Sequence, residues 1–161
     1  MNVSERVIAV PIVTLAIVVG SVIAGDPTVG PYAELRQPSW APGLPVWFAV
    51  AAIYYVIMAV VLTRLFARQN ESGAYVAIAM TIIVLIASEL WNVSLFRLGR
   101  ADYAFYTILP IAVLTFIAAL TALRVDWLSA FLLTVFLAWI GFDIVWTREL
   151  MALNTPAAIG S

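Results

Sequence analysis

The sequence predicts an all-α membrane protein, a polytopic bundle of five transmembrane helices in a single domain. Its 161 residues are 65% hydrophobic and 11% charged, whereas soluble domains are about 45–50% apolar and about 25% charged. A soluble fold of this length could not bury so much apolar surface, because it still exposes roughly a third of its chain. The few charged residues separate five apolar stretches, each close to the length of about 20 residues that a spanning helix needs.

Each expected helix is an apolar stretch that ends where charged residues appear. The connections after the second helix are short, which makes consecutive helices antiparallel neighbours. The first stretch also resembles a signal peptide, but its apolar part is longer than the core of such a peptide, which favours a retained helix. Four arginines would lie on each side of the membrane, so the positive-inside rule gives no orientation. The expected helices cover residues 7–24, 45–63, 74–96, 103–123 and 127–150 of the domain 1–161.

The composition also excludes several kinds of chemistry. The chain has no cysteine, histidine or lysine, so it cannot form a Cys/His metal site or use a thiol, imidazole or Schiff-base mechanism. A net charge of −1 without a basic cluster argues against nucleic-acid binding. We therefore expect no metal and no nucleic-acid partner. Any catalysis would have to use Asp, Glu, Tyr, Ser, Thr, Arg or a bound cofactor; we expect no obligatory cofactor and no enzymatic activity.

The only long connection, residues 25–44, is rich in proline. The segment 25–48 holds five of the eight prolines, and proline restricts the backbone, so this connector should be stiff. Tyr32, Trp40 and Trp47 are residue types found at membrane interfaces. Two interpretations remain open on these residues alone: an aromatic belt that anchors a re-entrant loop, or a lid over a cavity in the bundle.

Motifs along the whole chain resemble those of the TspO/MBR family, the tryptophan-rich sensory and translocator proteins. The loop and second helix show the spacing Tyr32-x-x-Leu35-x-x-Pro38-x-Trp40-x-Pro42, then Val46-Trp47 and Tyr55-x-x-Met58. Further matches are Gly20-Ser21, Ser88-x-x-Trp91 followed by Leu95-Phe96, Asp126, Trp139 and Asn154. The resemblance covers essentially the whole chain with the same five-span layout.

The resemblance implies a protein that binds hydrophobic, planar ligands, such as porphyrins and other tetrapyrroles, or sterol- and isoprenoid-like molecules. Light-dependent porphyrin breakdown is also attributed to the family. This chain departs from the family pattern at Ala51 and Ser88, where the family has a tryptophan and an asparagine that help form the ligand pocket. We therefore expect a pocket that is wider at these two positions, and altered affinity for benzodiazepine-site drugs.

Two acidic residues, Glu89 and Asp143, lie well inside expected spans, away from their ends. A charge at the centre of a bilayer costs at least about 2.5–3.5 kcal/mol, so each should face a partner or a cavity. Helical spacing places Asp143 on one face with Trp139 and Trp146, and Glu89 three residues before Asn92. They could form a polar centre in an aromatic cavity, hydrogen bonds between helices, or contacts in a dimer.

We thus predict an integral protein of a prokaryotic cell membrane that acts as a sensor, carrier or transporter. The alternatives are a structural subunit of a membrane complex and a proton-coupled transporter that uses Glu89 and Asp143. The expected partners are lipid, a hydrophobic small molecule such as a porphyrin or haem-type ligand, and a second copy of the chain, packed through the small residues Gly20, Ser21 and Ala24. The candidate ligand-binding residues are Trp40, Trp47, Ala51, Tyr55, Ser88, Trp91, Trp139, Asp143 and Trp146.

Overall fold

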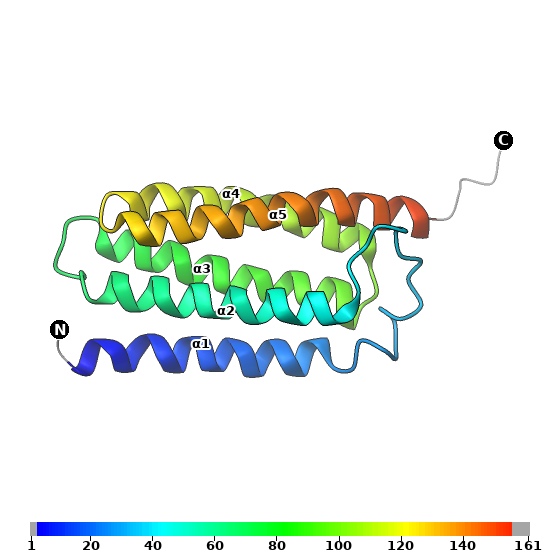
Figure 1. Cartoon of the computed structure of the whole chain (residues 1–161), viewed down its shortest axis with the longest axis horizontal. Coiled ribbons are helices and arrows are strands. Elements are labelled where there is room, and N and C mark those ends of the chain that lie inside the picture. The colour runs from blue at the N-terminus through cyan, green and yellow to red at the C-terminus, as the bar shows by residue number, and fades with distance from the viewer. Residues whose placement is uncertain (1–2, 156–161) are drawn as a thin grey trace.

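The chain folds as a bundle of five α-helices, with a π-helical turn after the third (Figure 1). The computed structural model describes the backbone of residues 3–155 and the side chains of residues 9–22 and 25–155. The elements are α1 (Val3–Ala24), α2 (Leu44–Phe66), α3 (Ala74–Asn92), η1 (Val93–Arg97), α4 (Ala101–Leu123) and α5 (Trp127–Asn154). The predicted all-α class is confirmed.

The helices have the length and composition of membrane spans. Within the described part of the chain, α2, α3 with η1, α4 and α5 are each long and apolar enough to cross a bilayer, and α1 contains a shorter apolar stretch, Ala9–Val22. Large apolar side chains such as Leu15, Val56 and Ile86 are exposed on the outside of the bundle. Such a surface is suited to lipid tails, which are as apolar as leucine.

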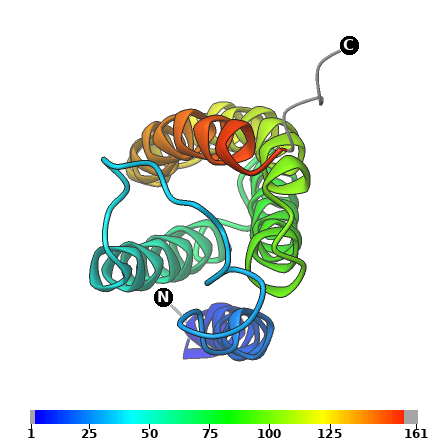
Figure 2. The ribbon, with the colours of Figure 1, turned by 90° about the vertical axis from the view of Figure 1, so that its right-hand side faces the viewer.

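Helices α2, α3, α4 and α5 surround the centre of the bundle, and α1 packs outside this ring against α2 and α3 (Figure 2). The connection 25–43 crosses the end of the bundle where α1 stops and α2 starts. The C-terminal end of α5 lies at this same end (Figure 1). The loop is therefore placed over whatever space the helices leave between them.

Six helix ends differ from the expected bounds by one to four residues, and the start of α2 and the end of α3 have local reasons. Helix α2 begins at Leu44, with Pro45 in its first turn, where the missing N–H of a proline is tolerated. The third span changes from α to π geometry at Val93 instead of continuing as α-helix to residue 96. Gly99 follows with φ +59°, and a Cβ at this position would stand 2.6 Å from Cβ of Pro31. The turn after η1 therefore needs a glycine to fit against the loop.

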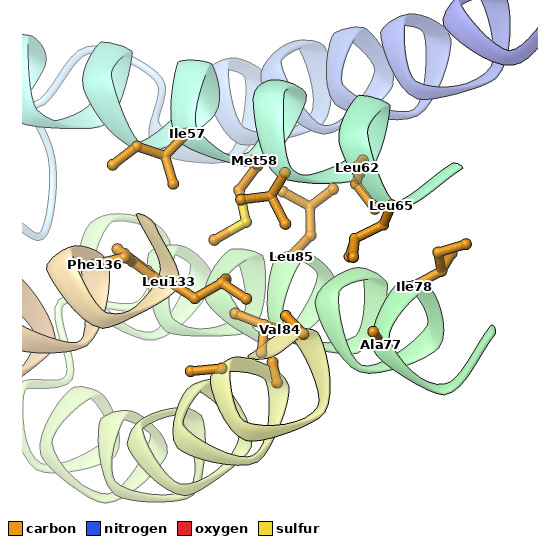
Figure 3. Close-up of a cluster of buried hydrophobic side chains, with 14 of the residues drawn as sticks. Ile57, Met58, Leu62, Leu65, Ala77, Ile78, Val84, Leu85, Leu133 and Phe136 are labelled. Atoms are coloured by element: carbon orange, nitrogen blue, oxygen red, sulfur yellow. The ribbon is translucent and has the colours of Figure 1, made fainter. Parts of the chain in front are cut away.

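The end of the bundle away from the loop is closely packed. Large buried side chains of α2 interdigitate with those of α3 and α5, among them Leu62, Val84 and Leu133 (Figure 3). Threonines in this region bond back to their own helices, as Thr81 does to Ala77 O at 2.8 Å. This packing leaves the open space of the bundle in its other half.

An ion pair ties α2 to α5 at the same end. Asp126 caps α5 by accepting bonds from Ser129 N (3.0 Å) and Ser129 Oγ (2.6 Å). Its carboxylate also accepts two bonds from Arg64, at 2.6 and 2.9 Å, and Arg68 Nη2 lies 3.3 Å away. The bonds from Arg64 hold the pKa of Asp126 well below its usual range. This charged cluster fixes the two helix ends together.

Candidate ligand-binding cavity

A cavity of about 200 Å³ lies in the loop-side half of the bundle and contacts all five helices. Its wall is mostly aliphatic and aromatic. The lining residues are Gly20, Ser21, Pro27, Leu44, Trp47, Phe48, Val50, Ala51, Tyr54, Tyr55, Ser88, Trp91, Asn92, Phe96, Ile108, Ile111, Phe136, Trp139, Ile140 and Asp143.

The structure brings most of the predicted site residues together around this one space. Seven of the nine candidates line it, namely Trp47, Ala51, Tyr55, Ser88, Trp91, Trp139 and Asp143. The helical repeat explains their grouping, because residues four apart share a face. Trp47, Ala51 and Tyr55 follow this spacing along α2, as Trp139 and Asp143 do along α5.

Tryptophans from three helices form one side of the site. The rings of Trp47 and Trp139 meet edge to face with centroids 5.6 Å apart. Trp146 packs against Trp47 at 4.4 Å and against Trp91 at 6.3 Å. Aromatic pairs at such distances stabilise each other beyond their burial. The wall is therefore held in shape by ring contacts between α2, α3 and α5.

The other two candidates, Trp146 and Trp40, are not among the residues that line the cavity. Trp146 is buried, with 1% of its surface exposed, and supports Trp47 and Trp91 from behind. It lies seven residues after Trp139, on the same face of α5 but about 10 Å further along the helix, where the rings of Trp47 and Trp91 pack against it. Trp40 belongs to the loop, and its Nε1 donates to Glu149 Oε2 at 2.7 Å, which keeps its indole outside the cavity.

The loop is attached to the C-terminal part of α5. Asn154 Oδ1 accepts from Arg36 N at 2.8 Å, and Asn154 Nδ2 donates to Arg36 O at 3.0 Å. Trp40 also packs edge to face on Phe142 with centroids 5.7 Å apart. Of the two interpretations of this segment, the contacts favour a lid, because they hold the loop across the end of the bundle (Figure 2) and Pro27 of the loop lines the cavity.

Several polar atoms at the site are buried without a hydrogen-bond partner. These are Tyr54 Oη, Trp91 Nε1, Trp146 Nε1 and Asp143 Oδ1. Buried polar groups normally find partners, and those that do not require an explanation. Tyr54, Trp91 and Asp143 line the cavity, so a ligand in it could supply the missing partners.

Glu89 plays a different part from Asp143. It is buried but is absent from the cavity wall. Its Oε1 accepts a bond from Tyr55 Oη at 2.8 Å, and its Oε2 accepts one from Asn92 Nδ2 at 2.9 Å. Tyr55 and Asn92 both line the cavity. Glu89 therefore positions two wall residues and does not itself face the space.

Gly20 makes this arrangement possible. A Cβ at Gly20 would stand 2.7 Å from Glu89 Oε2 and would also collide with Tyr55 Oη. Gly20 thus serves packing inside this chain, and Ser21 lines the cavity. Gly20 is buried, Ser21 is exposed, and the side chain of Ala24 lies outside the described residues. The expected homodimer stays a prediction.

The two small residues at which the chain departs from the family pattern lie at the cavity wall, and the expected widening stays a prediction. Ala51 and Ser88 both line the cavity. The hydroxyl of Ser88 donates to Val84 O at 2.9 Å, so it bonds within its own helix.

The sequence did not point to the contribution of α4. Ile108 and Ile111 close that side of the cavity, and isoleucines in a uniformly apolar helix carry no signal that separates a cavity wall from ordinary core. Tyr54 was also missed, although it lies three residues after Ala51, on the same face of α2 as the predicted residues. Phe136 stacks on it with centroids 4.7 Å apart.

Within residues 3–155, no group of three or more histidine, cysteine, aspartate or glutamate residues is placed to hold a metal ion. The cavity wall offers aromatic faces, one carboxylate and a few N–H and O–H groups. These groups are suited to holding an apolar molecule and fixing its orientation.

Comparisons with known proteins agree with the motifs. The model of the TspO/MBR family matches residues 7–152, nearly the whole chain and all five helices. A search of curated proteins found no match.

Proposed function

Because the chain belongs to the TspO/MBR family, a family of membrane proteins, we propose that it binds a hydrophobic, planar ligand in the cavity between its helices. It acts as a sensor or carrier of that ligand within a prokaryotic cell membrane. The observation that carries the proposal is an aromatic cavity whose wall contains buried polar atoms without partners. Packing on the rings would supply affinity, and the polar atoms would set orientation.

The size of the cavity constrains the ligand. Its volume of about 200 Å³ is below the range of about 300–1,000 Å³ that is typical of sites for drug-sized molecules. A compact aromatic molecule fits the space as it stands. A tetrapyrrole such as a porphyrin requires the site to widen, and the loop 25–43 is the segment whose release would allow this.

Binding is favoured over catalysis and over proton-coupled transport by the distribution of charge. Among the described residues, the wall carries one carboxylate, Asp143, and no basic side chain. A two-carboxylate mechanism would need Glu89 at the wall as well, and Glu89 is engaged by Tyr55 and Asn92. A homodimer and an accessory role in a larger complex remain separate proposals that do not depend on the cavity.

Tryptophan fluorescence tests the proposal. Protoporphyrin IX is titrated into the detergent-solubilised protein, into Trp139→Phe and into a matched control, Trp127→Phe. Both residues lie on α5, but Trp139 lines the cavity, whereas Trp127 is 69% exposed and lies about 18 Å away along the helix. We expect saturable quenching in the wild type, weaker binding in Trp139→Phe and unchanged affinity in Trp127→Phe.

The two variants also distinguish the emission of tryptophans at the cavity from that of tryptophans far from it. Removing Trp127 should raise the fraction of emission that is quenched, because a distant contributor is lost. Quenching that does not saturate, or equal affinities in the two variants, would contradict binding in this cavity.

A further inference from the structure

We propose that the cavity selects ligands that carry a protonated amine on a compact aromatic scaffold, with Asp143 as the counter-charge. This inference rests on the proposed function and names the chemical class that the same site prefers. It concerns Asp143, a buried acid in the wall of the cavity.

The position of Asp143 is the first argument. Its side chain lines the cavity from α5, only 6% of the residue is exposed, and Oδ1 has no hydrogen-bond partner. An isolated carboxylate in an apolar interior is costly unless it is paired and hydrogen-bonded. A ligand that brings an N–H donor with a positive charge would satisfy both requirements at once.

No cation of the protein takes this role. Among the residues that the structure describes, no arginine lines the cavity. Arg64 and Arg68 are engaged by Asp126 at the opposite end of the bundle. Arg100 pairs with Asp102 at 2.6 Å, outside the cavity. Because none of the described basic side chains pairs with this acid, an ion pair with Asp143 requires a cation from a bound molecule.

The aromatic wall favours the same kind of ligand. Trp47, Trp91, Trp139 and Tyr54 line the space into which Asp143 faces. A cation near the face of such rings is attracted by their quadrupoles, most strongly by tryptophan and more so when water is excluded. An acid surrounded by aromatic rings thus recognises an ammonium group by charge and by ring contact together.

The same features argue against an anionic ligand group next to Asp143, so the two propionates of protoporphyrin would have to point away from this residue. A ligand carboxylate would meet the carboxylate of Asp143 with no basic side chain at the wall, and like charges at close range in an apolar site repel strongly. The volume of about 200 Å³ further restricts the ligand to a single-ring scaffold unless the site widens.

Phenethylamine and 2-phenylethanol form a matched pair of probes, because they differ only in an ammonium group against a hydroxyl group. Their affinities are measured at pH 7.5 by calorimetry on the detergent-solubilised full chain. The charge-assisted bond to Asp143 should make the amine bind at least about tenfold more tightly than the alcohol. In Asp143→Asn the affinity for the amine should fall by about tenfold or more. Asp102→Asn, which changes an exposed acid outside the cavity, should leave it unchanged.

A second pair of variants keeps the test decisive if Asp143→Asn does not fold, which its melting curve would show. Ala51→Trp fills part of the cavity and should weaken amine binding, whereas Ala52→Trp, whose residue does not line the cavity, should not. Equal affinity for amine and alcohol, or unchanged amine binding in folded Asp143→Asn, overturns the inference and leaves the proposed function standing. If neither probe binds, the inference is overturned, and the protoporphyrin titration decides separately on the proposed function.

Discussion

Replacing Asp126 by asparagine tests whether the ion pair between α2 and α5 holds the bundle together. The carboxylate is almost fully buried, with 2% of its side chain exposed, and Arg64 and Arg68 beside it are 32% and 34% exposed. Asparagine caps helices about as well as aspartate, so the substitution removes the charge and leaves the cap to Ser129 in place.

The size of the effect follows from this geometry. Breaking a buried ion pair by removing one partner costs about 3–5 kcal/mol. The two arginines are partly exposed and recover some hydration, so we expect a loss of about 2–3 kcal/mol. For a chain of this length about 1 kcal/mol corresponds to roughly 2–4 °C, which gives a fall in melting temperature of about 4–12 °C.

The measurement is the thermal unfolding of the detergent-solubilised protein, followed by tryptophan emission at neutral pH. Asp102→Asn is the matched control, because Asp102 also accepts two bonds from an arginine, Arg100, near a helix start. That pair is exposed and local, with side chains 49% and 36% exposed, so its loss should cost less than about 1 kcal/mol. Equal shifts in the two variants would refute the assignment of stability to the buried pair.

Three further predictions follow from other contacts. The pKa of Asp126 is lowered in the fold by its bonds to Arg64, so its contribution to stability is complete above the unfolded pKa of about 3.9 and is lost as pH falls below that value. The melting temperature of the wild type should therefore drop from pH 5 to pH 3 more steeply than that of Asp126→Asn. Parallel curves for the two proteins would contradict this. Gly20→Ala places a Cβ against Glu89 and should destabilise the chain by about 1–3 kcal/mol through overpacking, measurable by the same melting assay; an unchanged melting temperature would show that α1 is not held against this carboxylate. Asn154→Ala removes both bonds to Arg36 and should speed hydrogen exchange in residues 25–43 without changing exchange in α3; unchanged loop exchange would mean that other contacts hold the lid.

The spans could be predicted from the sequence because charge and apolar length alone define them. Arg64, Asp126 and their neighbours interrupt the apolar runs, and the helices stop close to them. The π-turn at Val93 could not be predicted, and neither could the close approach of Gly99, in the turn after it, to Pro31. Local composition carries no record of such a contact between distant segments.

The candidate site was predictable to the extent that helical spacing determines which residues share a face. Trp139 and Asp143 lie one turn apart, and both reach the cavity. Spacing could not tell which of two buried acids would face the space, because that depends on partners from other helices. Glu89 finds Tyr55 across the bundle, and Asp143 finds no such partner.

Trp146 is a second residue for which helical spacing did not decide the position relative to the cavity. Its spacing groups it with Asp143, yet its ring is covered by Trp47. Because a helical turn takes about 3.6 residues, Trp146 does not stand directly above Asp143. The neighbouring helix decides whether its side chain lines the cavity or supports the wall. Tertiary packing, and not sequence pattern, settles such cases.

Native mass spectrometry of the detergent-purified protein tests most directly whether the cavity binds a ligand. The wild type, Ala51→Trp and Ala52→Trp are compared as purified and after addition of protoporphyrin IX. The two variants make the same substitution at adjacent positions of α2, but only Ala51 lines the cavity. We predict a bound small molecule on the wild type and on Ala52→Trp, and a clear loss of that species on Ala51→Trp. No bound species on the wild type, or equal occupancy on all three proteins, would contradict ligand binding in this cavity.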